Sequence, residues 1–434
     1  MQFYNLRHPE ERVSYKKATL LGQGKDNGLF FPKSIPKFSV KFLSQLSHLP
    51  NVEIGFECMK DFIGEEIPEE ILRNICEETL CFPFPLVEIS PEISALEMFH
   101  GPSLAFKDVG ARFMSRCLSY FLKEEDKKIW VLVATSGDTG GAVASGFYGI
   151  SDIEVIILYP KNRVSPVQEK QLTGLRGNVK ALEVKGSFDD CQRLVKEAFS
   201  DTELNEKMSL TSANSINISR WLPQQVYYLI AQKEWQKKHK AKPVISVPSG
   251  NFGNLCAGML AYRRGMPVDH FIAACNKNDV VPKYLKTEKY STIKALPTLS
   301  NAMDVGNPSN FVRVMELFGY SFKDLSAILS GESITDAETL AVIEKIKTAS
   351  GYTLDPHGAV AYLALENYLS LHLGKKGFFL ETAHPVKFPD AVERATNKKI
   401  PLPETLKPLM KKEKITVEIS SNYSDFRAFL SQLF

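Results

Sequence analysis

The segment HGPSLAFKDVGARF (100–113) contains a lysine whose surroundings suit it to act as a nucleophile. Lys107 follows Ala105 and Phe106, and the helical pattern that begins near Asp108 places it at a helix N-terminus. An apolar niche and the positive end of a helix dipole both disfavour a charged amine. A neutral amine can attack a carbonyl carbon. The alternative is an ordinary surface lysine at a helix start, and this segment alone leaves both interpretations open.

A Gly-rich turn follows the apolar run at 129–134 and precedes a second helical pattern. Its hydroxyl groups, small residues and free backbone N–H groups are suited to bind a carboxylate or a phosphate. An ordinary turn that caps the next helix is the alternative. The residues of this turn are Thr135, Ser136, Gly137, Asp138 and Thr139.

A second turn of similar design follows the apolar run at 244–247. Small side chains there would let the backbone approach a phosphate closely. Neither turn is a P-loop, because no Lys-Ser/Thr follows the glycines, and neither matches G-x-G-x-x-G. Two such turns in one chain predict a ligand with two separated anionic groups. The residues of the second turn are Ser249, Gly250, Asn251, Phe252, Gly253 and Asn254.

The segment TSANSINISRWLPQ (211–224) is rich in amides and hydroxyls and contains one cation. Asn214, Ser215 and Asn217 suit a polar pocket wall better than a strand. Arg220 offers a fixed fork of donors to an anion. A connecting loop with a solvated Arg220 is the open alternative.

The elements that must position these residues alternate between strand and helix. IWVLVA (129–134) is continuously apolar, which is typical of a buried parallel strand. Alternation of this kind predicts an α/β fold with mainly parallel sheets flanked by helices, and ligands collect at the carboxyl ends of such strands. The predicted strands are 129–134, 154–159, 179–184, 244–247, 271–275 and 378–381, and the predicted helices include 108–125, 165–174 and 189–200.

Composition narrows the class of protein further. The 434 residues carry a net charge of +3, which gives no reason to expect nucleic acid or a charged membrane as partner. No apolar run approaches the ~20 residues that a membrane span needs, and the N-terminus lacks the apolar core of a signal peptide. Seven cysteines without a C-x-x-C pair indicate reduced thiols in a cytoplasmic protein. His357 and His384, both expected between secondary elements, are interpreted as turn residues, and no metal site is predicted.

HGPSLAFKD, ATSGDTGGA and PSGNFGN, in this order and spacing, resemble the pyridoxal-phosphate enzymes of the tryptophan-synthase-β fold type (fold type II). Within that group the chain resembles the threonine synthase family, in the longer form found in many bacteria and fungi. The resemblance covers at least 95–395, and the N-terminal GQGKDNGLFFP (22–32) departs from the family's usual APDGGL-like turn. It implies an N-terminal unit at 1–95, a cofactor-binding catalytic region at 96–395 and a C-terminal extension at 396–434.

The resemblance also implies roles for individual residues. Lys107 would carry the cofactor, and the turn 249–254 would hold the cofactor phosphate. The turn 135–139, through Thr135, Ser136 and Thr139, would receive the substrate α-carboxylate, with Asp138 near the phenolic oxygen of the cofactor. Thr382 would meet the pyridine nitrogen, where a hydroxyl, unlike a carboxylate, does not force protonation. The residues assigned to the substrate phosphate are Asn214, Ser215 and Arg220.

The implied reaction converts O-phosphohomoserine and water into threonine and phosphate. Three alternatives stay open at this point: a phospholyase that gives 2-oxobutyrate, a dehydratase of free serine or threonine, and a non-catalytic protein on the same scaffold. The phosphate residues around Arg220 argue against free amino acids as substrates. The presence of Lys107 and of both anion-binding turns argues against a purely structural role. The sequence indicates no separate allosteric domain and leaves the oligomeric state open.

Overall fold

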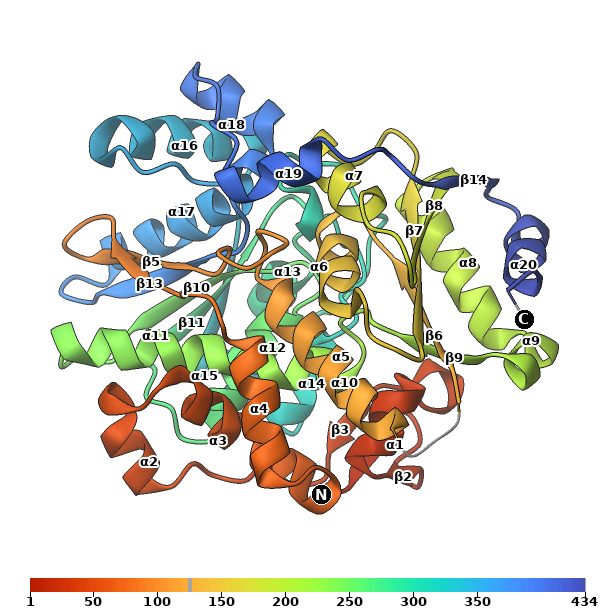
Figure 1. Ribbon diagram of the computed structural model, residues 1–434. Coiled ribbons are helices and arrows are strands. Elements are labelled where there is room, and N and C mark those ends of the chain that lie inside the picture. Colours follow the sequence, from red (N-terminus) through yellow and green to blue (C-terminus); the bar gives the residue numbers. More distant parts are fainter. Residues whose placement is uncertain (124–126, 434) are drawn as a thin grey trace.

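Two parallel sheets form the body of the protein in the computed structural model, which describes residues 1–123 and 127–433 (Figure 1). The first has six strands, in the order β12-β11-β10-β13-β5-β4, and only the β4–β5 pair is antiparallel. The second has five strands, all parallel, in the order β14-β8-β7-β6-β9. The six strands are β12 (Leu329–Ser333), β11 (His270–Cys275), β10 (Val244–Pro248), β13 (Gly377–Glu381), β5 (Ile93–Glu97) and β4 (Leu86–Glu88). The five are β14 (Val417–Ser420), β8 (Val179–Lys185), β7 (Ile153–Pro160), β6 (Ile129–Ala134) and β9 (Ser209–Ser212).

The central strands β6 and β10 are buried along their whole length, because helices cover both faces of each sheet. Alternate residues of β10 illustrate this: Ile245 and Val247 belong to the core shared with the helices α11 and α12, whereas Val244 packs with α17. In the five-stranded sheet, Val131 and Val133 face α6, and Leu132 faces α8 and α20. The covering helices are α6 (Asp138–Phe147), α7 (Pro166–Thr173), α8 (Phe188–Ser200), α11 (Gln225–Lys238), α12 (Gly253–Arg263), α16 (Asp336–Ser350), α17 (Pro356–Leu371) and α20 (Tyr423–Ser431).

Helix α5 (Lys107–Leu122) lies between the two sheets and belongs to both of their cores (Figure 1). Val109 and Phe113 pack in the core that contains α11 and α12, whereas Met114 and Leu118 pack with β6 and α6. The helix is therefore held from both sides, and its first residue is fixed relative to both sheets. The predicted helix 108–125 matches α5, except that residues 124 and 125 lie outside the described residues.

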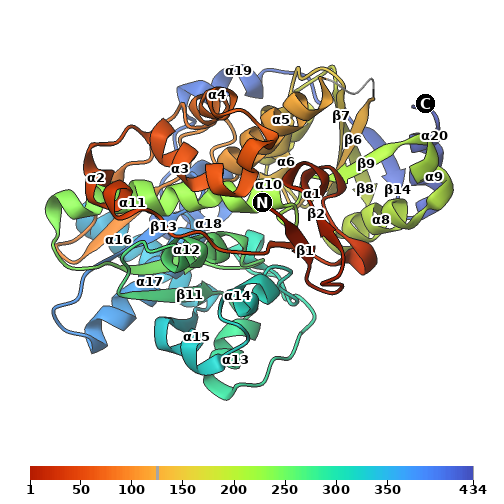
Figure 2. The same cartoon turned by 90° about the horizontal axis from the view of Figure 1, so that it is seen from below.

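The N-terminal unit packs beside α11, α12 and α5 (Figure 2). It contains a three-stranded antiparallel sheet, β2 (Arg12–Val13), β1 (Phe3–Asn5) and β3 (Phe30–Pro32). Its helices are α1 (Tyr15–Leu21), α2 (Val40–Gln45), α3 (Asn51–Ile63) and α4 (Glu69–Thr79). The remaining helices of the chain are α9 (Thr202–Lys207), α10 (Ile218–Trp221), α13 (Val280–Thr287), α14 (Phe311–Leu317), α15 (Phe322–Ile328), α18 (Pro389–Thr396) and α19 (Lys407–Met410).

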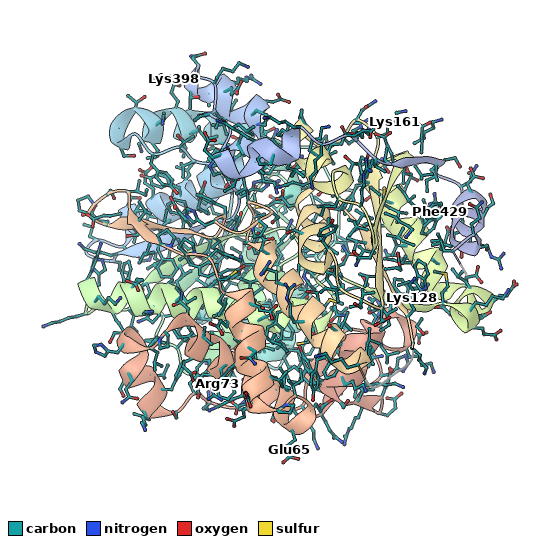
Figure 3. The ribbon with its side chains drawn as sticks, in the orientation of Figure 1. Glu65, Arg73, Lys128, Lys161, Lys398 and Phe429 are labelled. Carbon is teal, nitrogen blue, oxygen red and sulfur yellow. The ribbon has the colours of Figure 1, made fainter. Side chains whose placement is uncertain are left out.

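One buried arginine fastens the N-terminal unit to the six-stranded half. Arg264 is fully buried and donates to the backbone carbonyls of Pro36, Glu57 and Cys58. Its guanidinium also pairs with Asp61 at 2.8 Å. By contrast, labelled charged side chains such as Glu65, Lys161 and Lys398 lie at the periphery of the molecule (Figure 3). No helix among the described residues is long and apolar enough to cross a membrane.

We expect Arg264→Met to lower the free energy of unfolding by about 2–3 kcal/mol, because it removes the charged hydrogen bonds of a buried guanidinium, including those to Pro36 O and to Asp61. Urea denaturation of the purified protein measures this loss. Arg263→Met is the matched control, since Arg263 is exposed one residue earlier, and its effect should stay within about 0.5 kcal/mol. Equal losses in both variants would contradict the role given to Arg264.

Candidate active site

Most of the residues singled out from the sequence line one cavity of about 1100 Å³. The turns that follow β6, β10 and β13, each at the carboxyl end of its strand, meet there, as expected for parallel sheets. The start of α5 and the segment around α10 complete the wall. The lining residues predicted from sequence are Lys107, Thr135, Ser136, Asp138, Thr139, Asn214, Ser215, Arg220, the loop 249–254 and Thr382. Gly137 and Asn217 are not among the cavity's lining residues. The expectation that Asn217 belongs to the pocket wall is wrong, because Asn217 is fully buried, caps α10 and donates from Nδ2 to Thr19 O and Ser212 O.

Lys107 is the first residue of α5 and is fixed by the backbone on its N-terminal side. Phe106 N donates to Thr382 O at 2.8 Å, and Tyr227 Oη donates to Phe106 O. These bonds tie the start of α5 to the end of β13 and to α11. The lysine side chain keeps only 17% of its surface exposed.

The electrostatic surroundings favour a neutral amine at Lys107. Burial lowers its pKa to about 8, the nearby Asp138 carboxylate opposes this, and Lys387 and Arg220 add to the lowering. A lysine with this pKa is about half neutral near pH 8, whereas an ordinary lysine is almost fully charged there. The sequence prediction of a poorly solvated amine therefore has a structural basis.

Asp138, the first residue of α6, accepts two hydrogen bonds on one carboxylate oxygen. Its Oδ1 accepts from Gln168 Nε2 at 2.9 Å and lies 2.8 Å from Lys387 Nζ. Its Oδ2 lies 3.9 Å from Lys107 Nζ. Burial raises the pKa of Asp138, but attraction to Lys387 and Lys107 outweighs it and leaves the pKa well below its usual value. The carboxylate therefore stays ionised between two ammonium groups.

Lys387 was missed by the sequence reasoning. It is fully buried at the end of the short 3-10 helix Pro385–Lys387, in the segment that follows β13. The one signal available was its place in AHPVKF, five residues after Thr382, among Pro and His in a turn. A lysine in such a turn is usually solvated, so only the fold reveals its burial.

The turn after β6 has a conformation that requires glycine at one position. Gly137 has φ +133°, and a Cβ there would lie 2.5 Å from Gln168 Cδ. Thr135 Oγ1 accepts from the backbone N–H groups of Gly137 and Gly140, each at 2.9 Å. The Thr135 hydroxyl therefore shapes the turn by accepting from two of its backbone N–H groups.

The loop 249–254 also brings backbone close to the cavity. A Cβ on Gly250 would lie 2.7 Å from Met303 Cα, so only glycine fits there. Phe252 is left-handed with φ 61°, and α12 begins at the next residue, Gly253. The first-turn N–H groups of α12 have no acceptor within the helix. Ser249 differs from its neighbours, because its N–H donates to Ala274 O and its hydroxyl to Val247 O.

The segment from Asn214 to Arg220 presents polar groups to the same cavity. Asn214 Nδ2 donates to Ala134 O at 3.0 Å, which ties this segment to the end of β6. Ser215 Oγ accepts from Asn310 Nδ2 at 3.2 Å. Arg220 is 3% exposed and donates from Nη1 to Ala213 O. Burial lowers its pKa to about 10, so the guanidinium remains a cation at neutral pH. The alternative of a solvated Arg220 is wrong.

Thr382 follows β13 and is 6% exposed, with its carbonyl bonded to Phe106 N. Glu381, one residue earlier, is fully buried on the other side of the strand, where Asp355 N donates to its Oε1 at 2.7 Å. Successive side chains of a strand point to opposite faces, so the hydroxyl of Thr382 lines the cavity and the carboxyl group of Glu381 points away from it.

His357 lies in the first turn of α17, not between elements as predicted, because Asp355 and Pro356 supply the cap and the first position of that helix. Its Nδ1 lies 2.5 Å from Asp355 Oδ1, and its Nε2 accepts from Ala302 N. His384 caps the 3-10 helix Pro385–Lys387. The described part of the chain contains no group of three His, Cys, Asp or Glu residues that could hold a metal ion.

Comparison with known proteins identifies the family. A model of pyridoxal-phosphate dependent enzymes matches 85–379, and models of the threonine synthase N terminus and C-terminal region match 2–80 and 358–430. Threonine synthase of Haemophilus influenzae is 44% identical over 430 residues, which cover 99% of each chain. The chain belongs to the threonine synthase family. The resemblance read from HGPSLAFKD, ATSGDTGGA and PSGNFGN is thereby confirmed.

Solved structures of threonine synthases agree with this assignment. The threonine synthase of Escherichia coli superposes with a TM-score of 0.93 at 42% identity, covering all of both chains. The pyridoxal-phosphate-bound threonine synthase of Brucella melitensis gives a TM-score of 0.92 at 33% identity, covering 100% of this chain and 99% of that one. The predicted α/β fold of type II is confirmed, and the chain is a pyridoxal-phosphate-dependent enzyme.

The residues present fit the cofactor of this family. Asn254 Nδ2 is buried and has no hydrogen-bond acceptor among residues 1–123 and 127–433. Asn254 lies in the first turn of α12, beside the close backbone approach at Gly250, where a phosphate can be bound. Lys107, whose pKa burial lowers to about 8, lines the same cavity.

The N-terminal unit also contributes to the cavity wall, which no motif predicted. These residues come from two loops. Neither their types nor their spacing suggests a binding site, so only their position in the fold reveals their role. They are Leu6, Arg7, Gln23, Asn27 and Leu29.

We expect the apoenzyme to bind added pyridoxal phosphate through Lys107 at a rate that rises with pH and levels off above about 8, since the amine is neutral above its pKa. An unshifted lysine would continue to gain rate up to about pH 10.4. Stopped-flow absorbance of the cofactor measures the rate, and Lys107→Ala, which lacks the amine, is the control. A rate that still climbs steeply beyond about pH 10 would contradict the lowered pKa.

Proposed function

We propose that this chain converts O-phosphohomoserine and water into threonine and phosphate. The observation that carries the proposal is the placement of Lys107 in one cavity with two anion-binding turns and the buried cation Arg220. Family membership supports the same reaction, because its relatives of similar length are threonine synthases. A substrate with a carboxylate at one end and a phosphate at the other matches two separated anion sites.

Each group of residues has a distinct task in the proposed reaction. The turn 135–139 offers its hydroxyls and the first-turn N–H groups of α6 to the substrate carboxylate. Asn214, Ser215 and Arg220 hold the phosphate. The loop 249–254, including the side chain of Asn254, holds the phosphate of the cofactor. Thr382 offers a hydroxyl to the pyridine ring of the cofactor. When bound, the cofactor supplies an electron sink for the carbanion that forms at the substrate.

Lys107 is the proposed proton carrier. Once substrate has displaced it, its amine is a base of lowered pKa that can remove the proton from the substrate α-carbon and return one later. Arg220 stabilises charge on the departing phosphate, which is worth most in a buried site. Lys107, together with the phosphate group, then takes a proton from the β-carbon as phosphate leaves from the γ-carbon. The γ-carbon is protonated, water adds at the β-carbon, and the α-carbon regains a proton.

The division into 1–95, 96–395 and 396–434 remains our prediction. We note that β5, at Ile93–Glu97, crosses the first boundary and pairs with β13 in the six-stranded sheet. We also propose a cytoplasmic location, supported by seven cysteines that are all free.

The proposed reaction is tested by incubating purified holoenzyme with O-phosphohomoserine and resolving the amino-acid and keto-acid products. We expect threonine and phosphate in equal amounts from the wild type, and no turnover from Lys107→Ala, which loses the proton carrier. Production of 2-oxobutyrate in place of threonine would mean a phospholyase. Unchanged turnover in Lys107→Ala would overturn the role of the lysine.

Arg220→Ala should lower kcat/KM for O-phosphohomoserine roughly ten- to a hundredfold, because a charged hydrogen bond typically contributes ~1.5–3 kcal/mol. The loss should extend to kcat, since the contact also acts on the departing phosphate. Arg163→Ala is the matched control, because Arg163 lines the same cavity but is exposed, and it should change kcat/KM little. Loss of bound cofactor in Arg220→Ala, or an equal effect of Arg163→Ala, would place the phosphate elsewhere.

A further inference from the structure

Lys387 and Asp138 form a buried ion pair beside the lysine that carries the cofactor. Lys387 Nζ lies 2.8 Å from Asp138 Oδ1 and donates to Ser103 O at 2.7 Å. Both side chains are nearly or fully buried, at 0% exposure for Lys387 and 5% for Asp138. We propose that Lys387 is a positioning residue, which through Asp138 sets the charge balance at Lys107 when the cofactor is attached there. This inference rests on the proposed cofactor role of Lys107.

The geometry makes Asp138 the link between the two lysines. Its Oδ1 accepts from Lys387 Nζ and from Gln168 Nε2, whereas its Oδ2 lies 3.9 Å from Lys107 Nζ. A lone carboxylate at that distance would strongly favour a protonated nitrogen on Lys107. A lone ammonium in the place of Lys387 would disfavour it. With both present, the two effects oppose each other, and the nitrogen keeps an intermediate proton affinity.

The other charged groups around the pair do not replace either partner. Arg220, on α10, adds positive charge near Lys107. Asp108, on α5, is buried and accepts from Ser103 N at 2.9 Å, and burial raises its pKa to about 6. His384 is near Lys387, but burial lowers its pKa to about 4, so it is neutral at working pH. Asp138 is the acidic group to which Lys387 Nζ is bonded.

A merely structural role for Lys387 makes a different prediction. Its bond to Ser103 O anchors the loop before α5, and Val386 beside it packs with Leu104. If anchoring were its sole task, removing the charge of Lys387 would weaken the fold or the cofactor site without a defined direction in proton affinity. The charge role requires shifts of opposite sign when Lys387 or Asp138 is neutralised.

The test titrates the visible absorbance of the cofactor bound through Lys107 in purified holoenzyme. Lys387→Met should raise the pKa of the lysine–cofactor nitrogen by about one unit or more, a tenfold gain in proton affinity, because Asp138 then acts unopposed. Asp138→Asn should lower that pKa, because Lys387 then acts unopposed. The double variant should return the pKa of the lysine–cofactor nitrogen close to the wild-type value. Such a double-mutant cycle isolates the coupling between Lys387 and Asp138.

Two further variants keep the inference falsifiable. Lys387→Arg retains the charge and should titrate like the wild type, even if Lys387→Met fails to fold. Lys398→Met removes an exposed lysine from the C-terminal part of the chain and should leave the pKa of the lysine–cofactor nitrogen unchanged. Shifts of the same sign in both single variants, a double variant no nearer to the wild type, or a Lys387→Arg shifted away from the wild-type pKa would each overturn the charge role.

The outcome separates this inference from the proposed function. If wild-type protein showed no absorbance of a lysine-bound cofactor, both would fail together. If the wild type showed that absorbance and turned over O-phosphohomoserine while Lys387→Met left its titration unchanged, the inference alone would fail.

Discussion

An amine that is buried loses much of the hydration that stabilises its charge, and most of this protein's architecture serves to place one amine in that condition. Lys107 begins a helix whose two faces belong to the cores of two different sheets. Its position can therefore change little without disturbing both. The charges nearby, Asp138, Lys387 and Arg220, are buried as well, so the interactions among them are poorly screened by water.

The geometry of the site also depends on the N-terminal unit. Arg313, on α14, is fully buried and donates to Phe30 O in β3 and to Ile216 O beside the proposed phosphate residues. It also donates to the side chain of Asn310, which in turn bonds Ser215 Oγ. The Arg313 guanidinium thus joins the N-terminal unit to the segment that carries Ser215. The N-terminal unit is a part of the site's support as well as of its wall.

The sequence predicted those elements whose pattern is local. IWVLVA is apolar throughout, and β6 occupies the same residues, 129–134. Both Gly-rich turns were found because strand, glycine and helix follow one another within a few residues. The edge strands β9, β12 and β14 were not predicted, since SLTS, LSGES and VEIS are short and polar and depend on a partner strand. Lys387 and the lining loops of the N-terminal unit were not found, because their role arises from contacts far away along the chain.

The connection between Phe106 and Thr382 has a consequence for how the protein is made on the ribosome. Phe106, which precedes Lys107, and its partner Thr382 emerge in the first and last third of synthesis, and Lys387 follows Thr382. A nascent chain that lacks β13 has neither the central strand between β10 and β5 nor the buried cation beside Asp138. Attachment of the cofactor is therefore a late event, and it marks a polypeptide whose translation is almost complete.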